Sequence, residues 1–323
     1  MITYEILNNL LKPIAPLTHD RDIQEIMINA GDNIWIEKAG VMTKTQIKID
    51  EKVLLNAIMV MNFANNKEGK GSPIIEGILP DGSRVGGAIP PVSKTACLSI
   101  RKFTKVKKDL DDYGIAGIGE KAIEQRANKP DNLKDYLIET IRSNKNIIVS
   151  GGTSSGKTTF FNVLLKYLDN NDRVITIEDI FELEVNVPNK VALSAAKYEN
   201  YDISINDLVK LSLRMRPDKI ILGEIRGAAG FDLMWAFNTG HSGGSTIHAN
   251  SIRATLSQLE MYVLMAKVDW DYKTMQKFIA NNVNTIIWLN RTKINGADIR
   301  GIGEIAEIKG INKDGDYELE KIF

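Results

Sequence analysis

The arrangement of apolar and polar positions changes in character at about residue 105. In the first part of the chain, short alternating segments are mixed with one segment of helical period. The predicted strands are 25–29, 33–37 and 97–103, and the predicted helix is 52–63. Asp81-Gly82 lies between two short apolar segments, which is a strong hairpin signal. These patterns predict an α+β domain.

From about residue 133, strand-like and helix-like segments alternate. The predicted strands are 147–150, 173–177, 220–222, 244–247 and 283–289, and the predicted helices are 133–143, 158–168, 205–215, 231–237 and 254–265. This alternation favours a mostly parallel sheet with helices packed on it. The segments 303–309 and 317–322 flank Asp314-Gly315 and are predicted to form a closing antiparallel hairpin.

The predicted fold class is therefore α/β, in two domains. A chain of 323 residues is long enough to bury two cores. We expect an α+β N-terminal domain at 1–104, a linker at 105–132 and a C-terminal domain with a mostly parallel sheet at 133–323. The linker begins with a charged stretch, and residues 113–128 have a helical or partly helical pattern.

The composition narrows the classes of partner and compartment. Basic and acidic residues both number 41, so the formal net charge is zero and direct nucleic-acid binding is not expected. The sequence contains neither a signal-peptide pattern nor an apolar run long enough to span a bilayer. Cys97 is the single cysteine, which excludes an intramolecular disulfide and a cysteine-based zinc site. We expect a cytoplasmic protein, at most peripheral to a membrane.

The most informative segment is residues 151–159, Gly-Gly-Thr-Ser-Ser-Gly-Lys-Thr-Thr. It matches the phosphate-loop pattern G-x-x-x-x-G-K-[ST], between a predicted strand and a predicted helix. Glycines allow backbone N–H groups to point at phosphate oxygens. Lys157 is expected to reach the β- and γ-phosphates, and the Thr158 hydroxyl to ligate Mg²⁺. The expected nucleotide-contacting residues are Gly151, Gly152, Thr153, Ser154, Ser155, Gly156, Lys157, Thr158 and Thr159.

Two predicted strands end in acidic residues. One runs into Glu178-Asp179 and the other into Gly223-Glu224. In a parallel sheet, ligands bind beyond the carboxyl ends of the strands, so both acids are expected at the same edge as Lys157. We expect Glu224 to help hold Mg²⁺ through water and Glu178 to polarise the attacking water, although the reverse assignment fits the sequence equally well.

Histidines and arginines complete the set of candidates. His248 ends an apolar strand at the same edge, where its imidazole could contact the γ-phosphate region, whereas His241 is interpreted as a structural histidine. No third ligand is spaced with them, so a metal site is disfavoured. Arg101 is the best candidate for a residue that reaches the nucleotide across a domain or subunit boundary, and Arg84 and Arg226 are further candidates.

Together these motifs resemble the secretion (traffic) ATPase superfamily, most closely the ATPases of type IV secretion and conjugal DNA transfer. The resemblance covers almost the whole chain, through ordered motifs at 79–85, 99–102, 151–159, 177–183, 213–227 and 239–250. Pro188-Asn189 and the region of 111–113 resemble the conjugal-transfer branch in particular. Ser154 stands where the family usually has Gly, and Ile180 stands where Thr or Pro is common.

The resemblance implies a homohexameric ring in which each subunit binds ATP between an N-terminal domain and a RecA-like C-terminal domain. In the family's terms Glu178 lies in the Asp box, Glu224 in Walker B and His248 in the His box. Arg84 and Arg101 correspond to N-terminal basic residues that approach the phosphates. The resemblance also implies a position at the cytoplasmic face of the bacterial inner membrane, with inner-membrane components of a secretion or conjugation machine as partners.

We therefore expect an ATPase that converts hydrolysis into motion of a ring, and three alternatives stay open. The first is a motor of type IV pili or type II secretion, although the type II branch commonly carries a four-cysteine zinc module that this chain lacks. The second is a RecA-like DNA-dependent helicase, which the zero net charge disfavours. The third is a nucleotide-gated scaffold with negligible hydrolysis.

Overall fold

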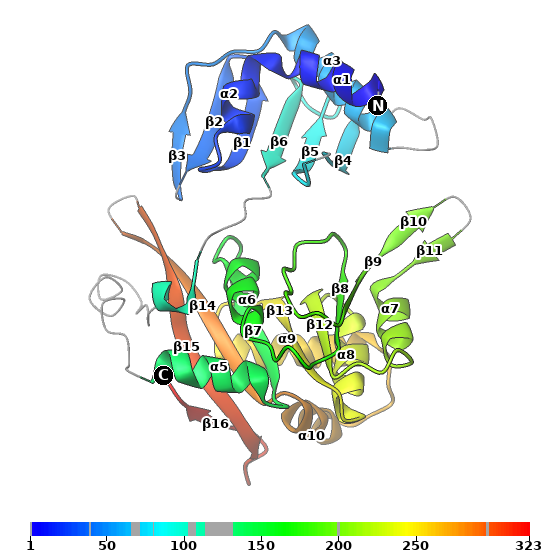
Figure 1. Cartoon of the computed structure of the whole chain (residues 1–323), viewed down its shortest axis with the longest axis vertical. Coiled ribbons are helices and arrows are strands. Elements are labelled where there is room, and N and C mark those ends of the chain that lie inside the picture. Colours follow the sequence, from blue (N-terminus) through cyan, green and yellow to red (C-terminus); the bar gives the residue numbers. More distant parts are fainter. Residues whose placement is uncertain are drawn as a thin grey trace. The chain divides into compact units, whose positions relative to one another are not determined.

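The computed structural model describes residues 2–38, 40–65, 72–79, 81–102, 108–113, 132–198, 201–294 and 297–323. The chain forms two compact units, Met1–Val106 and Lys107–Phe323 (Figure 1). The predicted helical segment 113–128 lies outside the described residues except for Tyr113. None of the helices in these ranges combines the length and apolar content needed to cross a bilayer.

The N-terminal unit is an antiparallel sheet with helices. Its strand order is β3-β2-β1-β6-β5-β4. The strands are β1 (Ile23–Ala30), β2 (Asn33–Lys38), β3 (Val41–Lys44), β4 (Ile74–Ile78), β5 (Arg84–Ala88) and β6 (Cys97–Arg101). The helices are α1 (Ile2–Leu10), the 3₁₀ turn η1 (Lys12–Ile14), α2 (Ala15–His19) and α3 (Glu51–Asn65). Leu7, Leu54 and Ile58 from the helices share one buried cluster with Ile26 and Leu98 from the sheet.

The predicted elements of this unit are confirmed. The strands at 25–29 and 33–37 and the helix at 52–63 are present, and the strand predicted at 97–103 is present over 97–101. The strands β4 and β5 form the hairpin around Asp81-Gly82. The loop is longer than a two-residue turn, because the Leu79 N–H donates to the Ser83 carbonyl at 2.8 Å. The elements of this unit that were not predicted are α1, η1, α2 and the exposed edge strand β3.

The C-terminal unit contains an eight-stranded sheet of order β16-β15-β14-β7-β13-β12-β8-β9. Its strands are β7 (Asn146–Gly151), β8 (Val174–Glu178), β9 (Lys190–Ser194), β12 (Lys219–Glu224), β13 (Ser242–His248), β14 (Thr285–Ile294), β15 (Ala297–Ile311) and β16 (Tyr317–Lys321). From β14 to β9 the neighbours are parallel, while β14–β15 and β15–β16 are antiparallel. A small ribbon pairs β10 (Ala196–Tyr198) with β11 (Tyr201–Ile203). The mostly parallel sheet and the closing hairpin are confirmed.

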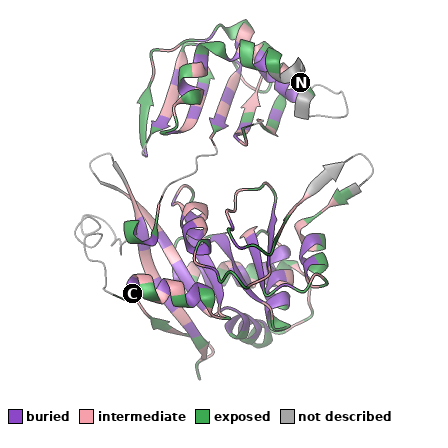
Figure 2. Ribbon diagram, viewed as in Figure 1, coloured by how far each residue is buried: buried purple, intermediate pink, exposed green. Residues whose placement is uncertain are grey.

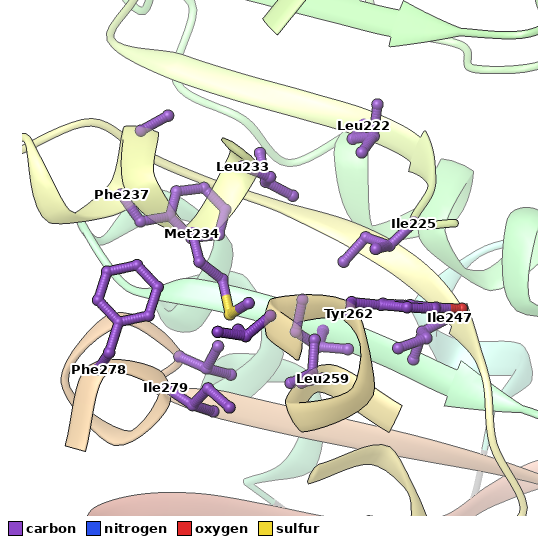
Figure 3. Packing of buried hydrophobic residues seen from close by; sticks show 14 of the residues in the cluster. Leu222, Ile225, Leu233, Met234, Phe237, Ile247, Leu259, Tyr262, Phe278 and Ile279 are labelled. Carbon is purple, nitrogen blue, oxygen red and sulfur yellow. The ribbon is translucent and has the colours of Figure 1, made fainter. Parts of the chain in front are cut away.

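Helices cover both faces of this sheet, and alternate residues of a strand therefore belong to different hydrophobic cores. They are the 3₁₀ turn η2 (Leu110–Asp112), α5 (Leu133–Arg142), α6 (Lys157–Leu165), α7 (Ile205–Ser212), α8 (Ala229–Asn238), α9 (Ile252–Met265) and α10 (Tyr272–Asn282). On β7, Ile148 belongs to the cluster with α7–α10, whereas Ile147 and Val149 belong to the cluster with α5 and α6. Figure 3 shows the first of these clusters, with Met234 from α8 beside side chains from α9 and α10.

Burial explains why the strands of this sheet read as continuous apolar runs. Residues 146–151 and 174–178 are buried throughout, as expected for parallel strands covered on both faces (Figure 2). The α/β fold class is confirmed. Leu110 and Tyr113, from the segment predicted as linker, are buried in the core of the C-terminal unit. The strand β9 and the helix α10 were not predicted.

Candidate nucleotide-binding site

The phosphate loop connects the central strand β7 with α6, as the motif requires. Gly151 ends β7, and a Cβ added there would lie 2.4 Å from Ser155 Oγ and 2.8 Å from the Leu289 carbonyl oxygen. Gly156 precedes the helix with a φ of 90°, a conformation that favours glycine. The loop therefore needs glycine at both positions that define the motif.

The backbone also explains the departure at Ser154. This residue has a φ of 58°, in the left-handed region where glycine carries no Cβ penalty. A serine at a position where the family usually has Gly is compatible with the loop, at a cost of about 1–2 kcal/mol in local strain.

The Lys157 side chain is buried against its own loop. Its Nζ donates to the carbonyl oxygens of Gly151 at 3.0 Å and Gly152 at 3.1 Å. The same ammonium lies 3.1 Å from Nδ1 of His248. Because an ammonium has no lone pair, Nδ1 must accept this hydrogen bond and the proton of the imidazole must be on Nε2.

His248 connects Lys157 to the acid at the end of β12. Its Nε2 lies 2.9 Å from Glu224 Oε1, so it donates to that carboxylate. The other oxygen, Oε2, accepts from Arg226 Nη2 at 2.6 Å and from Nε at 3.1 Å. The hydrogen bond to Glu224 raises the pKa of Arg226, against a smaller opposing effect of burial. Arg226 Nη1 is also 3.9 Å from Asp179 Oδ2.

Glu178 lies on the neighbouring strand and is held by backbone. Its Oε1 accepts from the N–H groups of Glu182 at 2.7 Å and Leu183 at 2.8 Å. A Cβ added at Gly223 would lie 3.1 Å from Glu178 Cγ, so the glycine before Glu224 makes room for this side chain. The structure therefore brings Lys157, Glu178, Glu224 and His248 to one edge of the sheet.

The loop fits the triphosphate and Mg²⁺ that the motif implies. A Cβ added at Gly152 would lie 3.3 Å from Asn250 Oδ1. The buried Ser155 hydroxyl has no hydrogen-bond partner among the described residues. Thr158 and Thr159 are half-buried in the first turn of α6. In the described ranges no three His, Cys, Asp or Glu residues form a metal cluster. Mg²⁺ takes one or two protein oxygens and otherwise binds water and substrate phosphates, so the Thr158 hydroxyl at the start of α6 fits as a ligand.

Arg84 and Arg101 lie in the N-terminal unit. They are direct partners on β5 and β6, and Arg101 is also opposite Glu25 on β1. Burial raises the pKa of Glu25, while the nearby Arg101 charge acts in the opposite direction. A role of either arginine at the nucleotide stays a prediction. His241 contacts the Ala236 carbonyl and the Thr239 hydroxyl, as expected for a structural histidine.

Sequence reasoning missed Arg291. Its Nη1 donates to the Thr153 carbonyl at 3.4 Å, so this arginine of β14 lies beside the phosphate loop. The contact arises because β14 pairs with β7, with Leu289 opposite Gly151. The predicted strand at 283–289 ended two residues before Arg291. The sequence also does not reveal that β14 lies beside β7, which is what brings Arg291 to the loop.

Comparison with known proteins gives the family. The sequence pattern of the family described as "Type II/IV secretion system protein" matches residues 8–294. The chain is 31% identical over 307 residues to "Probable conjugal transfer protein TrbB" of Sinorhizobium fredii, covering 93% of this chain and 87% of the relative. It is 29% identical over 292 residues to "Type IV secretion system protein VirB11" of Bartonella quintana, covering 81% and 82%.

A solved structure supports the fold. The crystal structure of the pilus retraction motor PilT with bound ADP matches with a TM-score of 0.61 at 18% identity, over 97% of this chain and 82% of that chain. At this identity the likeness concerns the fold alone. The family match extends across both units of the chain. The chain therefore belongs to the type II/IV secretion system protein family.

Proposed function

We propose that this chain is an Mg²⁺-dependent ATPase that drives a type IV secretion or conjugal DNA transfer machine. The observation that carries the proposal is the continuous contact from Lys157 through His248 to Glu224, beside a glycine-dependent phosphate loop. Two similar proteins are named for conjugal transfer and type IV secretion, which supports this choice of machine.

The residues of the loop take the binding role. Bound ATP with Mg²⁺ supplies the phosphoanhydride bond and the charge neutralisation on which hydrolysis depends. The backbone N–H groups of 152–158 and the start of α6 attract the phosphates. Lys157 would leave its carbonyl contacts to pair with the β- and γ-phosphates, while the Thr158 hydroxyl and Glu224, through water, would hold the metal.

The two glutamates take different roles because they are held differently. Glu178 is buried, and two backbone N–H groups fix one of its oxygens. A carboxylate fixed in this way is suited to orient a water molecule for attack. Glu224 is coupled through His248 to Lys157, so it belongs to the phosphate and metal side of the site.

The proposal extends to assembly and location. We propose a homohexamer at the cytoplasmic face of the inner membrane, in contact with membrane components of the machine. In this ring Arg101, assisted by Arg84, supplies positive charge to the nucleotide across a domain or subunit boundary. Both residues are on adjacent strands of the N-terminal unit, which allows them to act together.

The test is phosphate release from Mg-ATP by the purified full chain and by Glu178→Gln, with the particle mass measured in the same buffer. We expect turnover by a six-subunit particle, and a loss of about 10²-fold or more in the variant, as is typical when a catalytic base is removed. Turnover that requires DNA and falls steeply with salt would favour the helicase. Nucleotide binding without turnover would favour the scaffold.

A pilus motor would drive a different machine from the one proposed, and the chemistry of the site does not distinguish the two motors. The likeness to PilT shows that both share a fold. Deletion of the gene separates them. Loss of conjugal or secretion transfer in cells that lack the chain supports the proposal, and loss of pilus retraction alone contradicts it.

A further inference from the structure

The carboxylate of Glu224 is engaged on both oxygens. Oε1 faces the Nε2–H of His248 at 2.9 Å, and Oε2 faces two N–H groups of Arg226 at 2.6 Å and 3.1 Å. The guanidinium therefore holds one oxygen with two donors, which fixes the rotation of the carboxylate more firmly than a single contact. The direction in which Oε1 points therefore depends on these two hydrogen bonds from Arg226.

The backbone around Arg226 is anchored although its side chain is at the surface. Ile225 is buried in the core, and its N–H donates to the Thr246 carbonyl on β13 at 2.9 Å. Gly227 follows with a φ of 55°, so the chain turns immediately after the arginine. This turn directs Arg226 back to the end of its own strand, where it meets Glu224 and, at 3.9 Å, Asp179.

The charges nearby give the arginine a second task. A cavity of about 440 Å³ in the C-terminal unit is lined by Asp179, Asp202 and Glu224, and Arg226 is the one cation among the described residues that line it. Without the guanidinium, the Glu224 carboxylate would share this cavity with the carboxylates of Asp179 and Asp202, and their repulsion would loosen its orientation. Arg226 therefore both orients Glu224 and balances its charge.

We propose that Arg226 is a positioning residue for Glu224 and does not bind the nucleotide itself. It fixes Oε2, so that Oε1 stays against His248 and, through it, in line with Lys157 and the phosphate loop. Asp179 holds the far side of the guanidinium. This inference rests on the proposed function, because it assigns Arg226 to the catalytic use of Glu224 and departs from the sequence-based expectation that Arg226 contacts the nucleotide.

The experiment compares Arg226→Gln and Arg226→Lys in the full chain, with Arg214→Gln as the matched control. Arg214 is an exposed arginine ahead of β12 and is outside the contacts described above. Three quantities are measured: kcat and KM for phosphate release, the Mg²⁺ concentration for half-maximal turnover, and the affinity for a fluorescent ATP analogue in EDTA. Thermal unfolding checks the fold of each variant.

In Arg226→Gln we expect kcat to fall about 10–100-fold and the half-maximal Mg²⁺ concentration to rise, as for other residues that orient a metal-site carboxylate. Affinity in EDTA should stay within about twofold, because the arginine makes no nucleotide contact. Arg226→Lys should retain more of kcat than Arg226→Gln, because an ammonium balances the charge but cannot donate two hydrogen bonds with the fixed geometry of a guanidinium. Exposed ion pairs contribute little to stability, so the melting temperature should barely change.

A fall of tenfold or more in the EDTA affinity of Arg226→Gln would overturn the inference, because it would mean direct nucleotide binding. Unchanged kcat and Mg²⁺ dependence would overturn it as well. If the wild-type chain binds no analogue with or without Mg²⁺, the proposed function fails first and the inference fails with it, which separates the two.

Discussion

The conformation of single residues in the phosphate loop is set by how closely backbone atoms approach one another. Gly151 has no space for a Cβ, since Ser155 Oγ and the Leu289 carbonyl would lie at 2.4 Å and 2.8 Å. At Gly152 the close atom among the described residues is Asn250 Oδ1 at 3.3 Å, which is the end of an exposed side chain. The two adjacent glycines therefore differ in how much they constrain the loop.

We predict that Gly151→Ala destabilises the C-terminal unit by about 1–3 kcal/mol, the usual cost of overpacking. Gly152→Ala should change stability by less than about 0.5 kcal/mol, because Asn250 can move aside. Chemical denaturation of the two variants measures the difference. Equal stabilities would contradict the contact geometry.

Candidate residues at strand ends were predictable, whereas residues brought in by strand order were not. Glu178 and Glu224 follow apolar runs, and parallel strands place their carboxyl ends together. Arg291 reaches Thr153 only because β14 lies beside β7. The contact between Arg226 and Glu224 could not be predicted from the sequence either, because it depends on the turn at Gly227.

Whole elements escaped prediction where the local pattern was weak. The helix α10 buries Met275, Phe278 and Ile279 at helical spacing, and Asp271 caps it by accepting from the Thr274 N–H at 2.7 Å. These signals were present but short. The edge strand β9 alternates between exposed and half-buried residues only over Lys190–Leu193, and none of its residues is fully buried, so its pairing with β8 defines it more clearly than its pattern does.

Elements at the other edge of the C-terminal unit are joined by one charged network. Glu307 on β15 accepts from Tyr136 on α5, at 2.9 Å, and from Lys145 and Lys309, at 2.7 Å each. Burial opposes the charged form of Glu307, but the hydrogen bonds from Lys145, Lys309 and Tyr136 outweigh it and lower its pKa to about 2. Burial and the contact with Glu307 raise the pKa of Tyr136 to about 12.

This network predicts a pH-dependent stability difference between Glu307→Gln and wild type. Because the folded-state pKa is depressed, the contribution of Glu307 is complete above its ordinary pKa of 4.5 and is lost as the pH falls toward about 2. At pH 7 the variant should be less stable by about 1–2 kcal/mol, a range reduced for solvent screening. Thermal unfolding from pH 7 to pH 3 measures it. A difference that stays constant over this range would contradict the assignment.

At the scale of the whole molecule, the change in pattern near residue 105 predicts two domains joined by a linker at 105–132, and this division stays a prediction. The units divide between Val106 and Lys107, and Leu110 and Tyr113 already belong to the C-terminal core. The Tyr113 ring packs edge-on against Phe160 of α6, with centroids 4.9 Å apart. A charged, apolar-poor stretch gives no sign of such a tertiary contact, so its local pattern suggested a linker.

The central claim is that this chain hydrolyses Mg-ATP with Lys157 at the phosphates. The most direct measurement is phosphate release by the full chain, Lys157→Ala and Lys166→Ala. Lys166 is the matched control, because it follows α6 and contacts the Lys108 carbonyl, away from the loop. We expect steady turnover in the wild type and Lys166→Ala, and turnover at background in a folded Lys157→Ala. Wild-type turnover in folded Lys157→Ala, or none in the wild type, would contradict the claim.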